Sequence, residues 1–310
     1  MNVISLIVPC FNEETNIAPF YNEICRVIKL MDNADFELLF VDDGSKDRTW
    51  NIVEELHNQN NLVKGTKFIR NFGNQKALMA GMESTRDLGC DCVVTIDADL
   101  QQDEWAIERF IDEYMKGYDV VLGIRNDRKT DSFLKKTTAE MFYKTMNILG
   151  VNMPMNHSDY RLVNKKALDI MEYYPEKLFF LRGFFYEIGL PTSKVYFDVK
   201  ERMAGSSKFS YVTLMGLALN GITSYSIMPL RFVAVLGFLM ALFGGLVGVE
   251  TVFEKIFLHN SPNGWATAIV LNCLFSGIQL FCLGIIGEYV GQLYREVKAR
   301  PRYIKDIELK

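Results

Sequence analysis

Two long apolar stretches near the end of the chain restrict its possible folds more than any other feature of the sequence. The stretch from Phe232 to Phe253 contains Glu250 as its single charged residue, and the stretch from Trp265 to Gly287 contains none. Both exceed the roughly 18 apolar residues that separate a membrane span from a buried helix. A pair of core helices is the alternative, but two such runs in tandem are rare in soluble domains. We therefore predict two transmembrane helices within residues 230–294.

Basic residues on either side of these spans predict their orientation. Arg231 precedes the first span, and the second is followed by Arg295, Lys298, Arg300, Arg302 and Lys305. The connecting loop carries fewer cations, so the positive-inside rule puts both ends of the chain in the cytoplasm. No signal-peptide pattern precedes the first apolar run, Val3–Val8. We expect a multi-pass protein of the cytoplasmic membrane, with a large N-terminal domain inside the cell and no need for disulfides.

Short apolar runs of strand length alternate with helix-like stretches through the N-terminal part of the chain. The strand candidates are Val3–Val8, Phe36–Val41, Leu62–Ile69, Cys92–Ile96 and Val120–Ile124. The helix candidates lie near 15–30, 47–59, 74–87 and 104–116. Such alternation is typical of an α/β domain with a mostly parallel sheet that helices cover on both faces. We predict this fold class for the N-terminal domain.

Polar residues follow four of these strands, at the point where each apolar run ends. They lie in residues 9–14, 42–46, 97–101 and 125–129. Because ligands bind beyond the carboxyl ends of parallel strands, we expect these residues to converge on one site. The sequence has no Gly-x-Gly-x-x-Gly after a strand and no Gly-Lys-Ser/Thr phosphate loop. These absences argue against a nicotinamide-dependent or P-loop enzyme.

Two pairs of carboxylates stand out among these polar residues. Side chains two residues apart on an extended chain point the same way, so Asp97 and Asp99 would repel each other without a cation. A cation such as Mg²⁺ or Mn²⁺ would relieve the repulsion and hold the phosphates of a nucleotide. A solvated acidic turn is the alternative. Asp42 and Asp43 could accept hydrogen bonds from a base or ribose, or cap the helix that starts near Asp47.

Six motifs follow one another along the chain with a characteristic order and spacing. They are Val8–Glu13 (VPCFNE), Val41–Ser45 (VDDGS), Asp97–Gln101 (DADLQ), Ser158–Leu162 (SDYRL), Arg202–Lys208 (RMAGSSK) and Gly287–Gly291 (GEYVG). Together they resemble the family 2 polyprenyl-phosphate glycosyltransferases, above all the bactoprenol glucosyltransferase branch, with dolichyl-phosphate mannose synthase as a more distant relative. The resemblance extends over nearly the whole chain.

The resemblance implies a GT-A (Rossmann-like) fold and a set of site residues. A nucleotide-sugar donor would be bound by Pro9, Phe11, Asn12, Glu13, Asp42 and Asp43. The metal and the donor diphosphate would be held by Asp97, Asp99 and Gln101, and Arg202, Ser206 and Lys208 would belong to a loop that closes over the diphosphate. The implied reaction is inverting transfer of a sugar to undecaprenyl phosphate. Glucose from UDP-glucose is expected, with N-acetylglucosamine or mannose as alternatives.

The resemblance also makes Asp159 the candidate catalytic base. Ser158 precedes it where the family usually has glycine, which is a departure from the pattern. A phosphate monoester has its second pKa near about 6, so the acceptor is mostly a dianion and hardly needs a base. Asp159 could instead position a sugar hydroxyl or stabilise positive charge at the anomeric carbon. We expect the neighbouring His157 to be a loop residue rather than a metal ligand.

An anionic acceptor must also be brought close to an anionic donor. Two unit charges about 4 Å apart repel by roughly 4 kcal/mol at a surface-like dielectric, so nearby cations are required. The candidates for binding the acceptor phosphate are Arg125, Arg128, Lys135 and Lys136, which follow the fifth strand. Arg125 is the best placed because it lies directly at the strand end. An ordinary basic surface is the alternative.

These expectations divide the chain into four parts. Residues 1–208 form the catalytic domain, 209–229 a helix at the membrane surface, 230–294 the two spans, and 295–310 a basic cytoplasmic tail. No nucleic acid partner is expected, and glycines in the spans would allow a homo-oligomer. A processive polysaccharide synthase is disfavoured because the chain lacks a Gln-x-x-Arg-Trp element. A non-catalytic nucleotide-sugar sensor or a lipid-binding scaffold is the remaining alternative.

Overall fold

An eight-stranded sheet forms the centre of the N-terminal domain. The computed structural model describes residues 2–31, 34–126, 156–176, 179, 181–200, 226–257 and 264–310. The strand order is β7-β5-β6-β4-β1-β2-β3-β8. The strands are β1 (Asn2–Cys10), β2 (Ala34–Asp42), β3 (Val63–Phe68), β4 (Cys92–Thr95), β5 (Val120–Arg125), β6 (His157–Asn164), β7 (Thr192–Phe197) and β8 (Lys305–Leu309). Four of the seven strand pairs are parallel, which confirms the predicted fold class.

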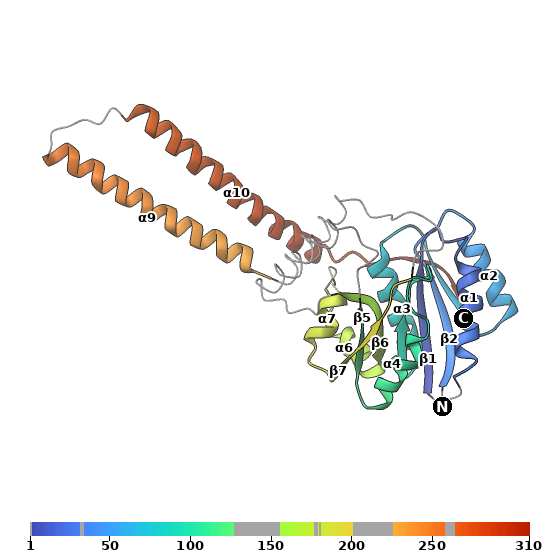
Figure 1. Cartoon of the computed structure of the whole chain (residues 1–310). Helices are drawn as coiled ribbons and strands as arrows, with labels where there is room; N and C mark the ends of the chain where they lie inside the picture. Colours follow the sequence, from blue (N-terminus) through green and yellow to red (C-terminus); the bar gives the residue numbers. More distant parts are fainter. Residues whose placement is uncertain are drawn as a thin grey trace.

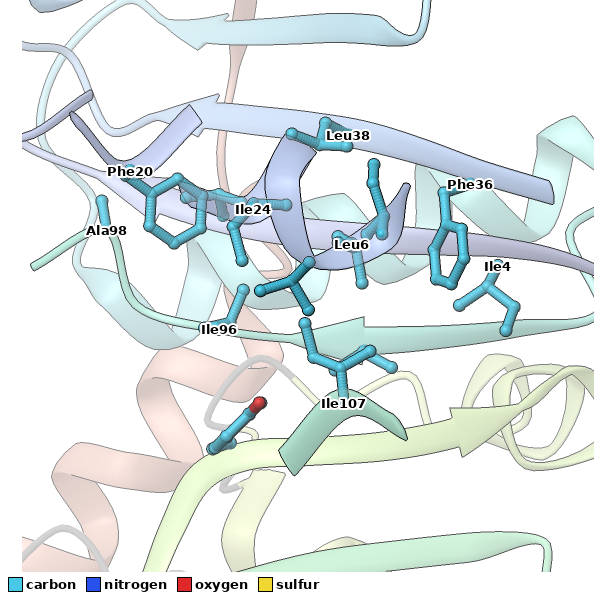
Figure 2. Close-up of a cluster of buried hydrophobic side chains, with 14 of the residues drawn as sticks. Ile4, Leu6, Phe20, Ile24, Phe36, Leu38, Ile96, Ala98 and Ile107 are labelled. Atoms are coloured by element: carbon cyan, nitrogen blue, oxygen red, sulfur yellow. The ribbon is translucent and has the colours of Figure 1, made fainter. Parts of the chain in front are cut away.

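Helices cover both faces of this sheet. They are α1 (Ile17–Ile28), α2 (Thr49–Gln59), α3 (Asn74–Leu88), α4 (Ala106–Met115), α6 (Lys165–Glu172) and α7 (Leu181–Glu187). Side chains alternate along β1, so Leu6 packs in a cluster with α1, α2 and α4, whereas Ile7 packs with α3, α6 and α7. Figure 2 shows the first cluster, where Leu6, Phe20 and Ile107 converge from β1, α1 and α4. Burying each such side chain contributes about 1.5–3 kcal/mol.

The predicted strands and helices of the first 125 residues agree with the structure to within two residues at each end. The segment around His157 does not agree. His157 was expected to be a loop residue, but it begins strand β6, in which every residue up to Val163 is buried. The prediction was wrong because Asp159 and Arg161 lie on the same side of the strand and form an ion pair of 2.6 Å. Paired in this way, both charges can enter the interior.

Two long apolar helices, α9 (Met228–Phe257) and α10 (Trp265–Val297), follow the sheet domain. Figure 1 shows them extending side by side away from the sheet. By length and composition both could cross a membrane, over Met228–Glu250 and Val270–Val297. The two predicted apolar helices are confirmed, although each begins or ends beyond the predicted limits. Most of the predicted interfacial helix, 209–225, lies outside the described residues.

The segment after α10 returns to the sheet domain (Figure 1). Its strand β8 pairs antiparallel with β3 and covers what would otherwise be an exposed sheet edge. Residues 295–310 were predicted only to be a basic cytoplasmic tail. Polar and apolar residues do alternate over Asp306–Lys310, a short strand signal that the prediction did not use.

Candidate active site

The loops that follow β1 and β2 are joined by hydrogen bonds. The amide of Asn12 donates to Ser45 Oγ at 2.8 Å, and the amide of Lys46 donates to Asn12 Oδ1 at 2.9 Å. Asn12 has a φ of 52°, a left-handed conformation that asparagine adopts more readily than most residues. The amide of Glu13 donates to Thr49 Oγ1 at 2.8 Å. Asn12 and Glu13, two of the predicted donor-binding residues, therefore fix the shape of the loop after β1. Pro9 and Phe11 precede them in the chain.

Asp42 and Asp43 are both buried at the end of β2 but have different surroundings. Asp42 Oδ1 accepts hydrogen bonds from the amide and the hydroxyl of Ser45, while its buried Oδ2 has no partner among the described residues. Burial raises the pKa of Asp42, although the bonds from Ser45 oppose the rise. Asp43 accepts from the amides of Phe72 at 2.6 Å and Gly73 at 2.8 Å. Asp42 thus has one carboxylate oxygen, Oδ2, without a described partner, whereas both oxygens of Asp43 hold the loop after β3.

Gly44 makes this close approach of two loops possible. Its φ is 70°, and a Cβ at this position would lie 2.4 Å from the backbone carbonyl carbon of Arg70. Any other residue would push the loop after β2 away from the loop after β3. The Asp-Asp-Gly motif is therefore required by the backbone as well as by its carboxylates.

Asp97 and Asp99 lie in the loop that follows β4, as the sequence analysis expected. Asp97 Oδ2 accepts from Gln102 Nε2 at 2.7 Å, and the amide of Asp97 donates to Gln102 Oε1 at 3.1 Å. Asp99 Oδ1 accepts from the amide of Gln101 at 3.2 Å. Burial raises the pKa of Asp97 to about 7, and the negative charges of Asp99 and Asp159 add to the rise. The loop concentrates negative charge around a carboxylate that has a neutral amide as its side-chain partner.

This donor set fits a hard divalent cation. Among the described residues, no group of three or more His, Cys, Asp or Glu side chains is arranged to hold a metal. Mg²⁺ is usually held by one or two carboxylates, with waters and substrate phosphates as the other ligands. Two oxygen donors, Asp97 and Asp99, on a loop that is short of positive charge match that pattern. Neither His nor Cys needs to take part.

Asp159, on the adjacent strand β6, is surrounded by cations instead. Arg182 binds it through Nε at 3.0 Å and Nη2 at 2.8 Å, and Arg161 Nη2 binds it at 2.6 Å. Gln75 Nε2 donates to its Oδ2 at 3.2 Å. Burial alone would raise the pKa of Asp159, but the charges of Arg182 and Arg161 hold this pKa well below its usual range. We refer to Asp159, Arg161, Arg182 and Gln75 as the β6 clamp.

Arg161 is the structural anchor of the β6 clamp. Its side chain is fully buried, its Nη1 donates to the carbonyl of Leu181 at 3.1 Å, and its guanidinium lies 5.4 Å from the ring of Phe185. These contacts tie β6 to α7, the helix that carries Arg182. The clamp is thus built from β6, α3 and α7 together.

Arg125 occupies the last position of β5 and is partly exposed. Its amide donates to the carbonyl of Asn156, at the start of β6. Its charge, like that of Arg182, acts to lower the pKa of Asp97. The predicted acceptor-binding arginine therefore lies near the carboxylate loop. The other predicted cations (Arg128, Lys135, Lys136, Arg202 and Lys208) and Ser206 lie outside the described residues.

Four residues of this site were given no role from the sequence. Arg161, Arg182 and Gln75 surround Asp159, and Gln102 holds Asp97. Gln75 and Gln102 lie in helix-like or polar stretches, where a single sequence gives no sign of their direction. Arg182 directly follows a short apolar run, and a charged residue at that position was the one sequence feature that could have marked it as a site residue.

Comparison with known proteins identifies the family. Residues 5–171, more than half of the chain, match the model of glycosyl transferase family 2. The chain belongs to this family. Residues 228–293, which contain most of α9 and α10, match the family model of the GtrB C-terminal hairpin. The protein is therefore a glycosyltransferase with an added apolar hairpin, as the resemblance implied.

Relatives of similar architecture are found in several bacteria and phages. An uncharacterized glycosyltransferase, YkoT, of Bacillus subtilis (strain 168) is 42% identical and covers 99% of this chain and 92% of its own. The bactoprenol glucosyl transferase of Shigella phage SfX is 38% identical and covers 97% of this chain and 98% of its own. A prophage bactoprenol glucosyl transferase homolog of Escherichia coli (strain K12) is 37% identical over 97% of both chains.

Among solved structures, the sheet domain is similar to mannosyl-3-phosphoglycerate synthase from Rubrobacter xylanophilus. The TM-score is 0.52 at 14% identity, over 72% of this chain and 73% of the other. This likeness concerns the fold alone. The domain therefore has the GT-A fold that the resemblance implied.

Proposed function

We propose that this glycosyltransferase transfers glucose from UDP-glucose to undecaprenyl phosphate at the cytoplasmic face of a membrane. The observation that carries the proposal is a carboxylate-rich strand edge in a family 2 domain that continues into an apolar hairpin. Relatives that share both parts over nearly their whole length are named bactoprenol glucosyl transferases. The product would be a lipid-linked monosaccharide.

The donor is proposed to bind across the ends of β1, β2 and β4. Asp42 Oδ2, which is buried and has no partner among the described residues, is proposed to accept a hydrogen bond from the base or ribose. The loop containing Asn12 is held rigidly enough to serve as a preformed wall. Asp97, Asp99 and Gln101 would face the diphosphate.

A divalent cation, Mg²⁺ or Mn²⁺, would be held by Asp97 and Asp99. When bound, it would neutralise the charge that develops on the departing nucleoside diphosphate. Gln102 keeps Asp97 oriented through its paired hydrogen bonds, so the ligand would be preorganised. The charges of Arg125 and Arg182 also act on Asp97 and lower its pKa.

Asp159 is proposed to act as an ionised positioning group rather than as a base. Two guanidinium groups lower its pKa, which makes it a weak proton acceptor at neutral pH. The lipid phosphate is mostly a dianion at that pH and is already nucleophilic. An ionised Asp159 could hold a sugar hydroxyl or stabilise the positive charge that develops at the anomeric carbon.

Arg125 is proposed to receive the acceptor phosphate, together with Arg128, Lys135 and Lys136. The two helices α9 and α10 would anchor the enzyme in the membrane that contains the lipid, with both chain ends in the cytoplasm. An arginine can bind a phosphate through two parallel hydrogen bonds, which orients the attacking oxygen. Self-association through the glycines of the hairpin stays a prediction.

The test is incorporation of radiolabelled sugar into undecaprenyl phosphate by the purified full-length protein. A panel of UDP- and GDP-sugars is supplied with Mg²⁺ or Mn²⁺, and each reaction is repeated with an excess of chelator. We expect a lipid-linked product from UDP-glucose that disappears on chelation and returns when the metal is added back. A product from another sugar would correct the donor. No product from any donor, with folded protein and lipid present, would favour the sensor or scaffold alternative.

A further inference from the structure

The tail that follows α10 makes an unusual set of contacts with the sheet domain. Arg302, only 14% exposed, lies between α3 and the segment that precedes α7. Its Nε donates to the carbonyl of Glu176 at 2.9 Å, and its Nη2 donates to the carbonyl of Tyr174 at 2.7 Å. Its Nη1 reaches Glu83 Oε1 on α3 at 3.2 Å. One guanidinium thus holds two separate elements together.

The neighbouring Tyr303 strengthens the same junction. Its hydroxyl donates to the other carboxylate oxygen of Glu83, and its ring stacks on Phe68 with centroids 5.0 Å apart. Arg302 also lies 5.6 Å from the ring of Phe179. Charged, aromatic and backbone partners therefore converge on the tail, which is more than is needed to add β8 to the sheet.

Arg302 contacts one of the helices that supply the outer partners of Asp159 and is connected to the other through Tyr174. Helix α3 carries Gln75 at its first turn, eight residues before Glu83. The ring of Tyr174, whose carbonyl accepts from Arg302, lies 4.9 Å from the ring of Phe184 on α7, and the second residue of α7 is Arg182. The tail thus contacts α3 directly and reaches α7 through Tyr174, whereas the β6 clamp contacts both helices.

We propose that Arg302 is a positioning residue for catalysis. By holding α3 and the segment before α7 at a fixed separation, it sets the distance at which Gln75 and Arg182 meet Asp159. Because Arg302 lies in the tail that follows the end of α10 at Val297, attachment of this tail to the sheet domain is coupled to the geometry of the β6 clamp. This positioning role rests on the proposed function only for the kinetic measurement, because hydrogen exchange can be measured without knowing the reaction.

Arginine is required for this role on chemical grounds. Three acceptors in different directions are satisfied by the fixed fork of one guanidinium, whereas a lysine ammonium is a single point charge. Arg302→Lys is therefore expected to keep the charge and lose the junction. Arg300, two residues earlier and exposed, provides the matched control, because Arg300→Gln removes the same charge from the same segment.

The experiment measures hydrogen exchange and transfer kinetics on full-length protein in lipid nanodiscs. For Arg302→Gln and Arg302→Lys we expect faster exchange in peptides covering 74–88 and 181–187, with β1 and β2 unchanged. We expect kcat to fall about tenfold with the donor KM within about twofold of wild type, since small displacements of positioning groups act on kcat. Arg300→Gln is expected to behave as wild type in both measurements.

Three results would overturn the inference. Unchanged exchange and kcat in Arg302→Gln would mean that the junction does not position the clamp. Faster exchange spread over the whole sheet domain would mean that Arg302 is merely structural, and rescue by Arg302→Lys would mean that charge alone matters. If wild-type protein transfers no sugar, the proposed function fails, while the exchange data still decide whether Arg302 controls the two helices.

Discussion

The β4 edge and the β6 edge of the site each carry a carboxylate, and the two edges are stabilised in opposite ways. Asp97, after β4, is held by a neutral glutamine beside another carboxylate, and its pKa is raised to about 7 by burial and by these negative neighbours. Asp159, on β6, is held by two arginines, and its pKa is lowered. In the proposed function the β4 edge takes a divalent cation from outside the chain, whereas the carboxylate of the β6 edge is already paired with arginines of the chain itself.

This contrast separates the positive charge that a bound ligand is proposed to supply from the positive charge that the folded chain supplies. We expect substitutions at the β4 edge to remove activity and leave stability intact, because the cation proposed to balance its negative charge binds together with the donor. Changes at the β6 edge should affect stability as well, because an unpaired charge would be left in the interior. Four substitutions test this division.

The largest effect is expected for Asp99→Ala. We expect sugar transfer to fall by at least about 1,000-fold, at the upper end of losses seen when an electrostatic group is removed from an active site. Membrane insertion and the thermal unfolding midpoint should stay unchanged. Asp112→Ala, an exposed carboxylate on α4, is the matched control and should retain full activity. Normal turnover by the Asp99 variant would remove the metal-binding role.

The next effect is a loss of stability in Arg161→Met. This change leaves the Asp159 carboxylate buried beside one guanidinium, and breaking a buried pair costs about 3 kcal/mol or more. The thermal midpoint of the purified protein should therefore drop by several degrees. The double variant Asp159→Leu with Arg161→Met should recover much of the loss, since no buried charge then lacks its partner. A single variant as stable as wild type would contradict the contrast between the two edges.

Arg182→Gln should produce a smaller, mainly kinetic effect. The side chain of Arg182 is 36% exposed, so solvent and Arg161 can replace part of its charge. We expect kcat to decrease about 30-fold, because Asp159 loses its bidentate partner and with it a fixed orientation. Steady-state kinetics measure this against Arg26→Gln, an exposed arginine on α1 that is paired with Glu23. An effect confined to the thermal midpoint would make Arg182 structural only.

The smallest effect is expected for Arg125→Ala. This arginine is partly exposed at the end of β5 and is proposed to receive the acceptor, so we expect about a tenfold rise in the KM for the lipid phosphate and little change in the KM for the donor. Titration of each substrate at saturating concentration of the other measures both values. A defect limited to donor binding would show that Arg125 does not receive the acceptor.

Most of the sheet domain could be predicted because its signals are local. Apolar runs and turn residues define β1 to β5 and the helices between them, and the strand-end rule brings Asp42, Asp97 and Arg125 to one edge. The order and spacing of the motifs indicate the family. These predictions do not require knowing which residues far apart in the sequence are in contact.

The β6 clamp and the tail could not be predicted for the opposite reason. A strand that contains Asp159 and Arg161 looks like a polar turn until the pairing of the two charges is known. The contacts of Arg302 with Tyr174 and Glu83 join residues more than 120 positions apart. Periodicity describes neighbours along the chain, so such long-range pairs leave no trace in it.

The position of β8 sets an order for making the protein. Its partner β3 ends at Phe68, yet β8 itself ends at Leu309 in a chain of 310 residues. The edge of β3 therefore stays unpaired during synthesis until both apolar helices have been made, and non-local pairing of this kind forms slowly. The catalytic sheet is completed only by a chain that already possesses its hairpin, so a truncated product would carry an open edge that invites aggregation.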